Sequence, residues 1–147
     1  GSIMMNLQEL QTIAGYNLPI KIFILNNSGY SSIFQTHRNF FNGHEVGAGP
    51  GSGVSFPSFE KLAYGFGIDY RRCATHEGMG DAVVATMASE GPSICEIMVD
   101  PDQPFAPKLS AKQHPDGRIT SPPLEDLSPF LTKEELWENL LITPLTE

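Results

Sequence analysis

The 147-residue sequence contains little cysteine and few basic residues. Its two cysteines, Cys73 and Cys95, lie far apart and form no Cys-x-x-Cys pair, which argues against a zinc or redox centre and favours buried free thiols. With 9 Lys and Arg against 17 Asp and Glu, the formal net charge is −8. No basic stripe is available to neutralise a nucleic-acid backbone, so we expect no nucleic-acid binding.

A long hydrophobic run is also missing. The longest one, residues 18–25, is interrupted by Lys21 and falls well short of the roughly 20 residues that a membrane-spanning helix needs. No signal peptide is visible. Together with the free thiols, these features predict a cytoplasmic protein that does not enter a membrane.

The hydrophobic residues, 40% of the total, are sufficient for one core. The sequence begins Gly1-Ser2 rather than with Met, so we expect a fragment of a longer protein. Whether these two residues are native or a cloning remnant stays open at this point.

Helix and strand patterns alternate along the first 100 residues. Apolar side chains recur at spacings of four, three and four from Ile3 to Ala14, which predicts one buried face of a helix over residues 3–14. Residues 19–25 are almost continuously apolar, as expected of a parallel strand covered on both faces. Further patterns predict helices at 30–41, 58–65 and 80–89, strands at 69–74 and 93–99, and a loop at 43–53. This order predicts a doubly wound α/β fold, a mainly parallel sheet with helices on both faces.

The composition changes after residue 100. Seven of the 12 prolines fall between Pro101 and Pro129, which predicts an extended segment without regular helix or sheet. A final helix is predicted over residues 133–141, capped by Thr132. We expect residues 1–100 to form the α/β domain, lacking its N-terminal part, and residues 101–147 to form an arm and C-terminal helix packed on the same domain. A disordered linker is the alternative.

A candidate anion and metal site lies where the first predicted strand ends. Asn27 follows that strand, and the helix that begins at Gly1-Ser2 would point its free amide groups at the same edge of the sheet. A diphosphate bound there would need a cation such as Mg²⁺, for which the Asn27 side chain and the Gly29 carbonyl offer oxygen ligands. The simpler interpretation is that these amides only terminate the strand and cap its turn.

The segments GSIMMNLQEL and LPIKIFILNNSGY resemble the thiamin diphosphate enzymes of the acetolactate synthase and pyruvate decarboxylase superfamily. The hallmark of these enzymes is Gly-Asp-Gly, followed after about two dozen residues by Asn-Asn. If Gly1 is the second glycine of that motif, residues 2–25 supply a spacer of the right length before Asn26-Asn27. The resemblance extends over about residues 1–100, and SICEIMVD resembles the last core strand of the family.

The resemblance implies a role for five residues. Asn27 would bind Mg²⁺ through its side chain and Gly29 through its carbonyl. Gly1 and Ser2 would meet the diphosphate of thiamin diphosphate through their amides, with help from the Ser2 hydroxyl, and Tyr30 would border the cofactor.

The resemblance also implies that parts of the active site lie outside this sequence. The motif aspartate, a further metal ligand, would directly precede Gly1, and the glutamate that activates the cofactor lies on a pyrimidine-binding domain, usually of a neighbouring subunit. We therefore expect no catalytic residue in this fragment, and we expect the fragment alone to be inactive. The full-length enzyme would be a homodimer or homotetramer acting on small 2-keto acids, and an FAD requirement stays open.

The sequence departs from acetolactate synthases after Asn-Asn. These enzymes commonly continue with Gly-Met-Val and Gln-Trp-Gln, whereas this chain has Tyr30-Ser31-Ser32-Ile33 and Gln35-Thr36-His37. Because these positions border the substrate pocket in the family, another thiamin diphosphate carboligase or decarboxylase stays an alternative, as does a non-catalytic binding module with the same fold. The four histidines lack metal-ligand spacing, and we expect surface or turn roles for them.

Overall fold

The computed structural model describes residues 1–142 and contains two compact units, which divide between Gln103 and Pro104. None of the helices in the described part of the chain is both long enough and apolar enough to cross a membrane.

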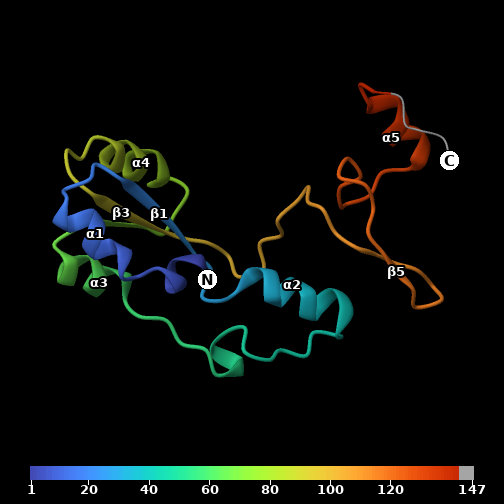
Figure 1. The fold of residues 1–147 in the computed structure, drawn as a ribbon, viewed down its shortest axis with the longest axis horizontal. Coiled ribbons are helices and arrows are strands. Elements are labelled where there is room, and N and C mark those ends of the chain that lie inside the picture. Colours follow the sequence, from blue (N-terminus) through green and yellow to red (C-terminus); the bar gives the residue numbers. More distant parts are fainter. Residues whose placement is uncertain (143–147) are drawn as a thin grey trace. The chain divides into compact units, whose positions relative to one another are not determined.

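A three-stranded parallel sheet forms the centre of the first unit (Figure 1). Its strands are β1 (Lys21–Asn26), β2 (Asp69–Cys73) and β3 (Ser93–Met98), in the order β1-β3-β2. The central strand is the most deeply buried, because residues 93–96 are covered on both faces. Both free cysteines are buried, as the sequence predicts, Cys95 on this strand and Cys73 at the end of β2.

Helices cover both faces of this sheet, as the sequence predicts. On one face α1 (Glu9–Gly15) and α3 (Phe59–Phe66) pack together, and on the other face α4 (Met79–Met87) lies against β2 and β3 (Figure 1). The main core fills the α1 and α3 side and consists of Leu10, Ile24, Phe59, Ala63, Ile68 and Ile94. Ser58 caps α3 as predicted, since its hydroxyl accepts a hydrogen bond from the Lys61 amide at 3.3 Å.

The helix predicted over residues 3–14 is divided in two. A 3-10 turn, η1 (Ser2–Met5), comes first, and α1 begins only at Glu9. The chain leaves helical geometry at Asn6, where φ is −136°. Apolar side chains before and after the break still pack on the core. The apolar spacing therefore predicted the buried face correctly but not the continuity of the helix.

Between β1 and α3 the chain forms α2 (Ser31–Phe40) and a second 3-10 turn, η2 (Pro50–Ser52). The turn lies within the predicted loop 43–53. The Ser52 hydroxyl accepts hydrogen bonds from the Ala48 and Gly49 amides at 2.9 and 3.1 Å, and Ala48 is completely buried. This part of the loop therefore has a defined fold of its own.

One edge of the sheet is left open in the described part of the chain. β1 pairs with β3 on one side, and no strand among residues 1–142 pairs with its other side. Because α4 packs mainly on β2 and β3, Phe23 and Leu25 of β1 are 37% and 59% exposed. The amino end of β1 is held by Lys21, whose ammonium donates to the carbonyls of Ser89, at 2.6 Å, and of Gly91.

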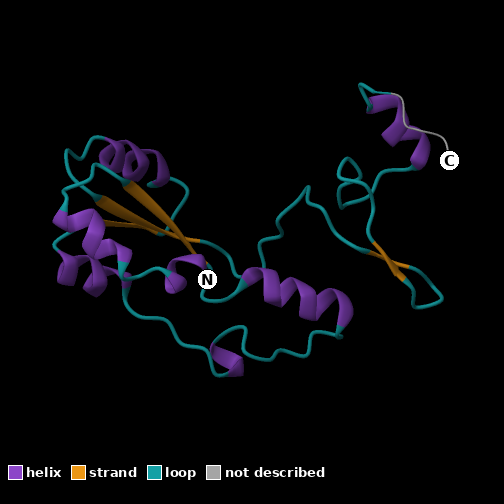
Figure 2. Cartoon of the chain, in the orientation of Figure 1, coloured by secondary structure: helices purple, strands orange, loops and turns teal. Residues whose placement is uncertain are grey.

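The second unit consists mostly of loops (Figure 2). It contains the antiparallel pair β4 (Lys112–Gln113) and β5 (Ile119–Thr120) and the helix α5 (Lys133–Asn139), capped by Thr132 as predicted. The prediction of no regular sheet here is wrong at this hairpin. None of the seven prolines falls on its strands, and Gly117, with φ of 82°, allows the reversal between them.

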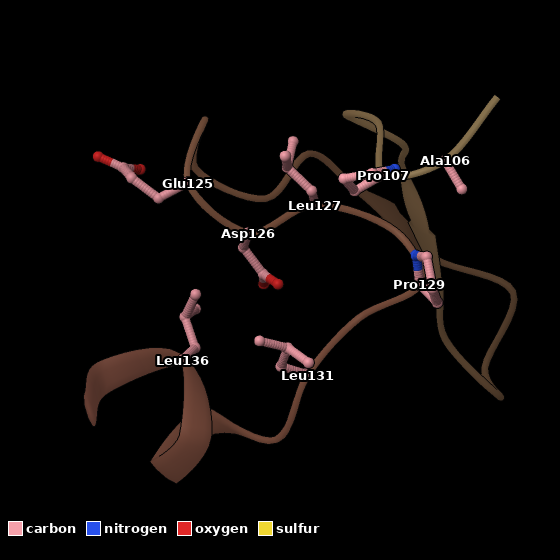
Figure 3. Close-up of a pocket in the computed structure, with 8 residues that line it drawn as sticks. All are labelled: Ala106, Pro107, Glu125, Asp126, Leu127, Pro129, Leu131 and Leu136. Carbon is pink, nitrogen blue, oxygen red and sulfur yellow. The ribbon is translucent and has the colours of Figure 1, made fainter. Parts of the chain in front are cut away.

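A cavity of about 440 Å³ lies within the second unit (Figure 3). Its lining is mainly apolar, and the Asp126 side chain points into it. Asp126 is 7% exposed, and its carboxylate accepts from the Lys112 ammonium at 2.5 Å. The Lys112 ammonium also lies 4.3 Å from the centre of the Phe130 ring, so this pair joins the hairpin to the chain that leads into α5.

Candidate functional site

The chain turns sharply after β1, and two asparagine side chains hold the turn. Asn26 Oδ1 accepts a hydrogen bond from the Ser28 amide at 2.9 Å, and Asn27 Oδ1 accepts from the Gly29 amide at 3.3 Å. Ser28 has φ of 57°, a left-handed conformation that side-chain bonds of this kind support. Both amides therefore cap the end of the strand, as the simpler interpretation expects, and Asn27 Oδ1 keeps a second lone pair.

Three of the five predicted site residues line one small cavity. Gly1, Asn27 and Gly29 line it together with Asn26 and with six apolar residues, and its volume is about 30 Å³. The apolar residues are Ile3, Met4, Ile24, Leu25, Phe56 and Phe59. This space holds about one water molecule or one metal ion and is too small for a diphosphate. Ser2 and Tyr30, the other two predicted residues, are not part of its lining.

Tyr30 lies beside Gly1. A Cβ atom on Gly1 would come within 2.6 Å of Cδ1 of the Tyr30 ring, so the ring occupies the place of a side chain there. The ring packs edge-on against Phe56 at a centroid distance of 5.5 Å, and the Tyr30 amide donates to the Ala48 carbonyl at 2.8 Å. Tyr30 thus shapes the border of the site from one side.

Gly29 lies in the most crowded part of the turn. A Cβ atom here would overlap Cε2 of Phe34 and lie 2.8 Å from its Cζ and 3.0 Å from the Ala48 carbonyl oxygen. A Cβ on Gly49 would reach the same ring at 2.5 Å. The Phe34 ring, which is 9% exposed, is therefore confined between two glycines, and it fixes the course of the main chain at Gly29.

The oxygen atoms at this edge suit a hard cation, although few of them are present. Asn27 offers an amide oxygen, and the Gly29 carbonyl accepts no hydrogen bond from any of residues 1–142. Mg²⁺ prefers six oxygen ligands, commonly with one or two carboxylates and phosphate oxygens among them. The described residues contain no group of three His, Cys, Asp or Glu side chains that could hold a metal. Asn27 and Gly29 therefore offer two oxygen atoms of the kind that Mg²⁺ takes as ligands, and the remaining positions around the ion would need other groups.

A buried glutamate, which the sequence patterns did not predict, lies near the turn. Glu96 of β3 is 7% exposed and accepts hydrogen bonds from Asn26 Nδ2 at 2.5 Å and from the Tyr70 hydroxyl. Burial, together with the hydrogen bond and negative charge of Glu96, raises the pKa of Tyr70 well above its usual value. The signal in the sequence is a single acidic residue within the otherwise apolar strand SICEIMV.

α2 leaves the site with one histidine facing inward. His37 Nδ1 is buried and has no hydrogen-bond partner, and its ring packs edge-on against Phe41 at 6.3 Å. We expected a surface or turn role for this histidine, but its ring nitrogen Nδ1 is buried. Its neighbour Arg38 forms an ion pair with Asp102 at 2.5 Å, which ties the helix to the end of the first unit.

Comparison with known proteins decides the family. Residues 1–97 match the family described as thiamine pyrophosphate enzyme, C-terminal TPP binding domain. The chain belongs to this family. As a TPP-binding domain of the acetolactate synthase-like type, it takes thiamin diphosphate, with the accompanying Mg²⁺, as its cofactor. The parallel sheet and its helices are those of the TPP-binding fold.

The relatives of this TPP-binding domain are larger enzymes. A probable acetolactate synthase 2, chloroplastic, of Oryza sativa subsp. japonica is 30% identical over 74% of the chain, and a probable acetolactate synthase large subunit of Methanococcus aeolicus is 30% identical over 81%. The thiamine diphosphate-dependent 4-hydroxybenzoylformate decarboxylase of Rhodococcus jostii RHA1 superposes on 71% of the chain with a TM-score of 0.61 and 28% identity. The chain spans only 17%, 21% and 19% of the lengths of these three proteins.

Proposed function

We propose that this TPP-binding domain binds the diphosphate and Mg²⁺ in an enzyme that decarboxylates a 2-keto acid such as pyruvate and joins the two-carbon unit to a second carbonyl, as acetolactate synthases do. The observation that supports this proposal is the cavity at the carboxyl end of β1. Gly1, Asn27 and Gly29 line it together, and they are three of the five residues that the family resemblance assigns to the cofactor.

In this proposal each residue of the chain has a binding task. Asn27 Oδ1 and the Gly29 carbonyl bind Mg²⁺, and the Gly1 and Ser2 amides bind diphosphate oxygens. Tyr30 borders the cofactor beside Gly1. When bound, thiamin diphosphate supplies the carbanion chemistry that decarboxylation requires. The chain itself contributes no acid or base to that step, so its contribution is binding and orientation.

The isolated 147-residue chain should bind thiamin diphosphate weakly or not at all, and should be inactive alone. Two protein oxygens leave most of the Mg²⁺ shell to other groups, and the pyrimidine ring of the cofactor meets a separate domain in the proposed enzyme. Calorimetric titration with thiamin diphosphate and Mg²⁺ tests this expectation. Tight binding by this chain would show that neither the carboxylate nor the second domain is essential.

A matched pair of extended chains tests the metal site directly. Adding Gly-Asp before Gly1 supplies the proposed carboxylate ligand, and adding Gly-Asn supplies the same shape without the charge. Mg²⁺-dependent binding of thiamin diphosphate should increase in the Gly-Asp chain alone, and Asn27→Ala should abolish the increase. Equal binding by the two extended chains would contradict the assignment of the metal ligands.

The open edge of β1 is the proposed attachment point for the rest of the sheet. α1 and α3 lie on the same face, and strand-helix-strand connections are right-handed. A strand that feeds η1 and α1 must therefore lie on the opposite side of β1 from β3. We place such a strand of the longer enzyme at this edge, where further structure would also cover Phe23 and Leu25.

In the isolated chain this surface should cause self-association, which sedimentation at increasing concentration measures. Leu25→Lys should reduce the association. Tyr64→Lys, which changes an 88% exposed side chain on α3, is the matched control and should have no effect. A monomer at high concentration would contradict the attachment surface.

There are two alternatives to this proposed function. The superposition on a thiamine diphosphate-dependent decarboxylase, with the departure at residues 30–37, supports another decarboxylase or carboligase. The second alternative is a non-catalytic binding module with the same fold. The sequence upstream of Gly1 distinguishes this module from an enzyme, because an enzyme needs both the Gly-Asp-Gly motif and the activating glutamate. The proposal for the longer enzyme also includes a pyrimidine-binding domain contributed by a neighbouring subunit, a homodimer or homotetramer, and a cytoplasmic location. Whether that enzyme needs FAD stays open.

A further inference from the structure

A row of hydrogen-bonded side chains, Tyr70, Glu96 and Asn26, crosses the sheet and ends at the proposed metal-binding turn. The Tyr70 hydroxyl of β2 donates to one carboxylate oxygen of Glu96, and Asn26 Nδ2 of β1 donates to the other at 2.5 Å. Asn26 Oδ1, at the far end of the same amide, accepts from the Ser28 amide at 2.9 Å. The row therefore runs from β2 through the central strand into the turn.

We propose that Glu96 is a positioning residue for the cofactor site, acting through Asn26 on the turn that carries Asn27 and Gly29. This inference rests on the proposed function for its purpose, but the geometry that it explains is independent of any cofactor.

The reason lies in the two ends of an asparagine amide. An ionised carboxylate only accepts hydrogen bonds, so Glu96 requires the NH₂ end of Asn26 to face it. The oxygen end must then face the turn, where it meets the Ser28 amide. In the opposite orientation the amide oxygen would face the carboxylate, so an acceptor would face an acceptor. The NH₂ group would then face the Ser28 N–H, so a donor would face a donor. Glu96 thus selects the single orientation of Asn26 that supports the turn.

Burial makes this selection stringent. Glu96 lies in the central strand with 7% exposure, so water does not readily replace a lost partner. Ser28 has φ of 57°, a conformation that a non-glycine residue needs local hydrogen bonds to maintain. Loss of the selection should therefore release Ser28 first and change the direction of the neighbouring Asn27 and Gly29 groups.

Amide hydrogen exchange of the 147-residue chain, resolved residue by residue by NMR, tests the proposal. Glu96→Met keeps the side-chain length and removes both acceptors, and it should speed exchange at Ser28 by about tenfold, the factor expected for one lost hydrogen bond. Glu96→Gln keeps an acceptor for Asn26 and should stay within about threefold of the wild type. Tyr70→Phe, which leaves the bond between Asn26 and Glu96 intact, is the matched control and should also stay within that range.

Three results would overturn the proposal. Unchanged exchange at Ser28 in Glu96→Met is the first, and an equal increase at every amide of β1 and β3, which indicates general loosening, is the second. The third is a Glu96→Gln rate as high as that of Glu96→Met. If Glu96→Met does not fold, the wild type decides: its Asn26 side-chain amide should exchange more slowly than that of exposed Asn39, and equal rates would refute the inference.

These readouts need no ligand, so they separate the two proposals. Failure of the extended chains to bind thiamin diphosphate would count against the proposed function and leave the exchange result valid. An exchange result that contradicts the role of Glu96 would leave the metal ligands unaffected.

Discussion

Replacing Gly29 with alanine tests the crowding around the turn. The new Cβ would overlap Cε2 of Phe34, lie 2.8 Å from its Cζ and lie 3.0 Å from the Ala48 carbonyl oxygen. Ordinary contacts of this kind are about 3.5–4.0 Å long, so the ring or the main chain must move by several tenths of an ångström or more. The ring has little room to move, because it is 9% exposed and Gly49 limits it on the other side.

Overpacking of a confined site of this kind costs about 1–3 kcal/mol. With a urea slope of about 1–3 kcal/mol per molar, the unfolding midpoint of Gly29→Ala should fall by roughly 1 M. Far-UV circular dichroism during urea titration measures the shift. Gly65→Ala is the matched control, because a Cβ there meets no atom within 4 Å and Gly65 lies in α3. It should raise stability by up to about 1 kcal/mol, since alanine favours helix over glycine.

A second substitution tests whether contact with the Phe34 ring causes the loss of stability in Gly29→Ala. In a Phe34→Leu background the ring that receives the clash is gone, so Gly29→Ala should cost much less than it does in the wild type. A Gly29→Ala midpoint equal to or above that of the wild type would refute the reasoning. An undiminished cost in the Phe34→Leu background would show that the ring is not the obstacle.

Three smaller predictions concern polar contacts. Ser58→Ala should cost about 1 kcal/mol in urea unfolding, because α3 loses its cap. Burial works to raise the pKa of Asp69, but hydrogen bonds from Arg71 and Ser89 outweigh it and lower that pKa. Asp69→Asn should therefore cost up to about 0.5 kcal/mol at pH 7, with the difference lost as the pH falls below 3.8 towards the lower folded value. Lys112→Met leaves buried Asp126 without its cation and should destabilise the second unit by about 1–2 kcal/mol, followed by the fluorescence of the single tryptophan, Trp137. An unchanged midpoint for Ser58→Ala or Lys112→Met, or an Asp69→Asn difference that persists in acid, would contradict the corresponding contact.

Much of the fold was predictable because its signals are local. β1 and β3 are mainly apolar runs, and Ser58 and Thr132 are standard caps whose hydroxyls accept hydrogen bonds from the expected amides. The break at Asn6 was not predictable, because the apolar spacing is the same for a 3-10 turn followed by a helix as for one helix. The short β4–β5 hairpin was hidden by the prolines around it.

At the site, the family resemblance named five residues, of which three line one cavity while Ser2 and Tyr30 lie outside its lining. These three are Gly1, Asn27 and Gly29, and the spacing contained no information on how they are held. The Glu96 row depends on the order β1-β3-β2, which places a residue of the last strand next to Asn26 of the first. No pattern within a single segment contains that pairing, although one acidic residue in an apolar strand is a clue to it.

The amino and carboxyl ends of the sheet at β1 differ in which groups complete them. At the amino end, Lys21 binds main-chain carbonyls of the α4–β3 connection, so this end is completed by the chain's own atoms. At the carboxyl end, the turn after β1 carries the proposed metal ligands, which are too few to complete a site. Substitutions at the amino end should therefore change how readily the domain unfolds. Substitutions at the carboxyl end, which can also affect unfolding as in Gly29→Ala, should in addition change what the domain can bind, so this is the end where a domain that still folds can lose its function.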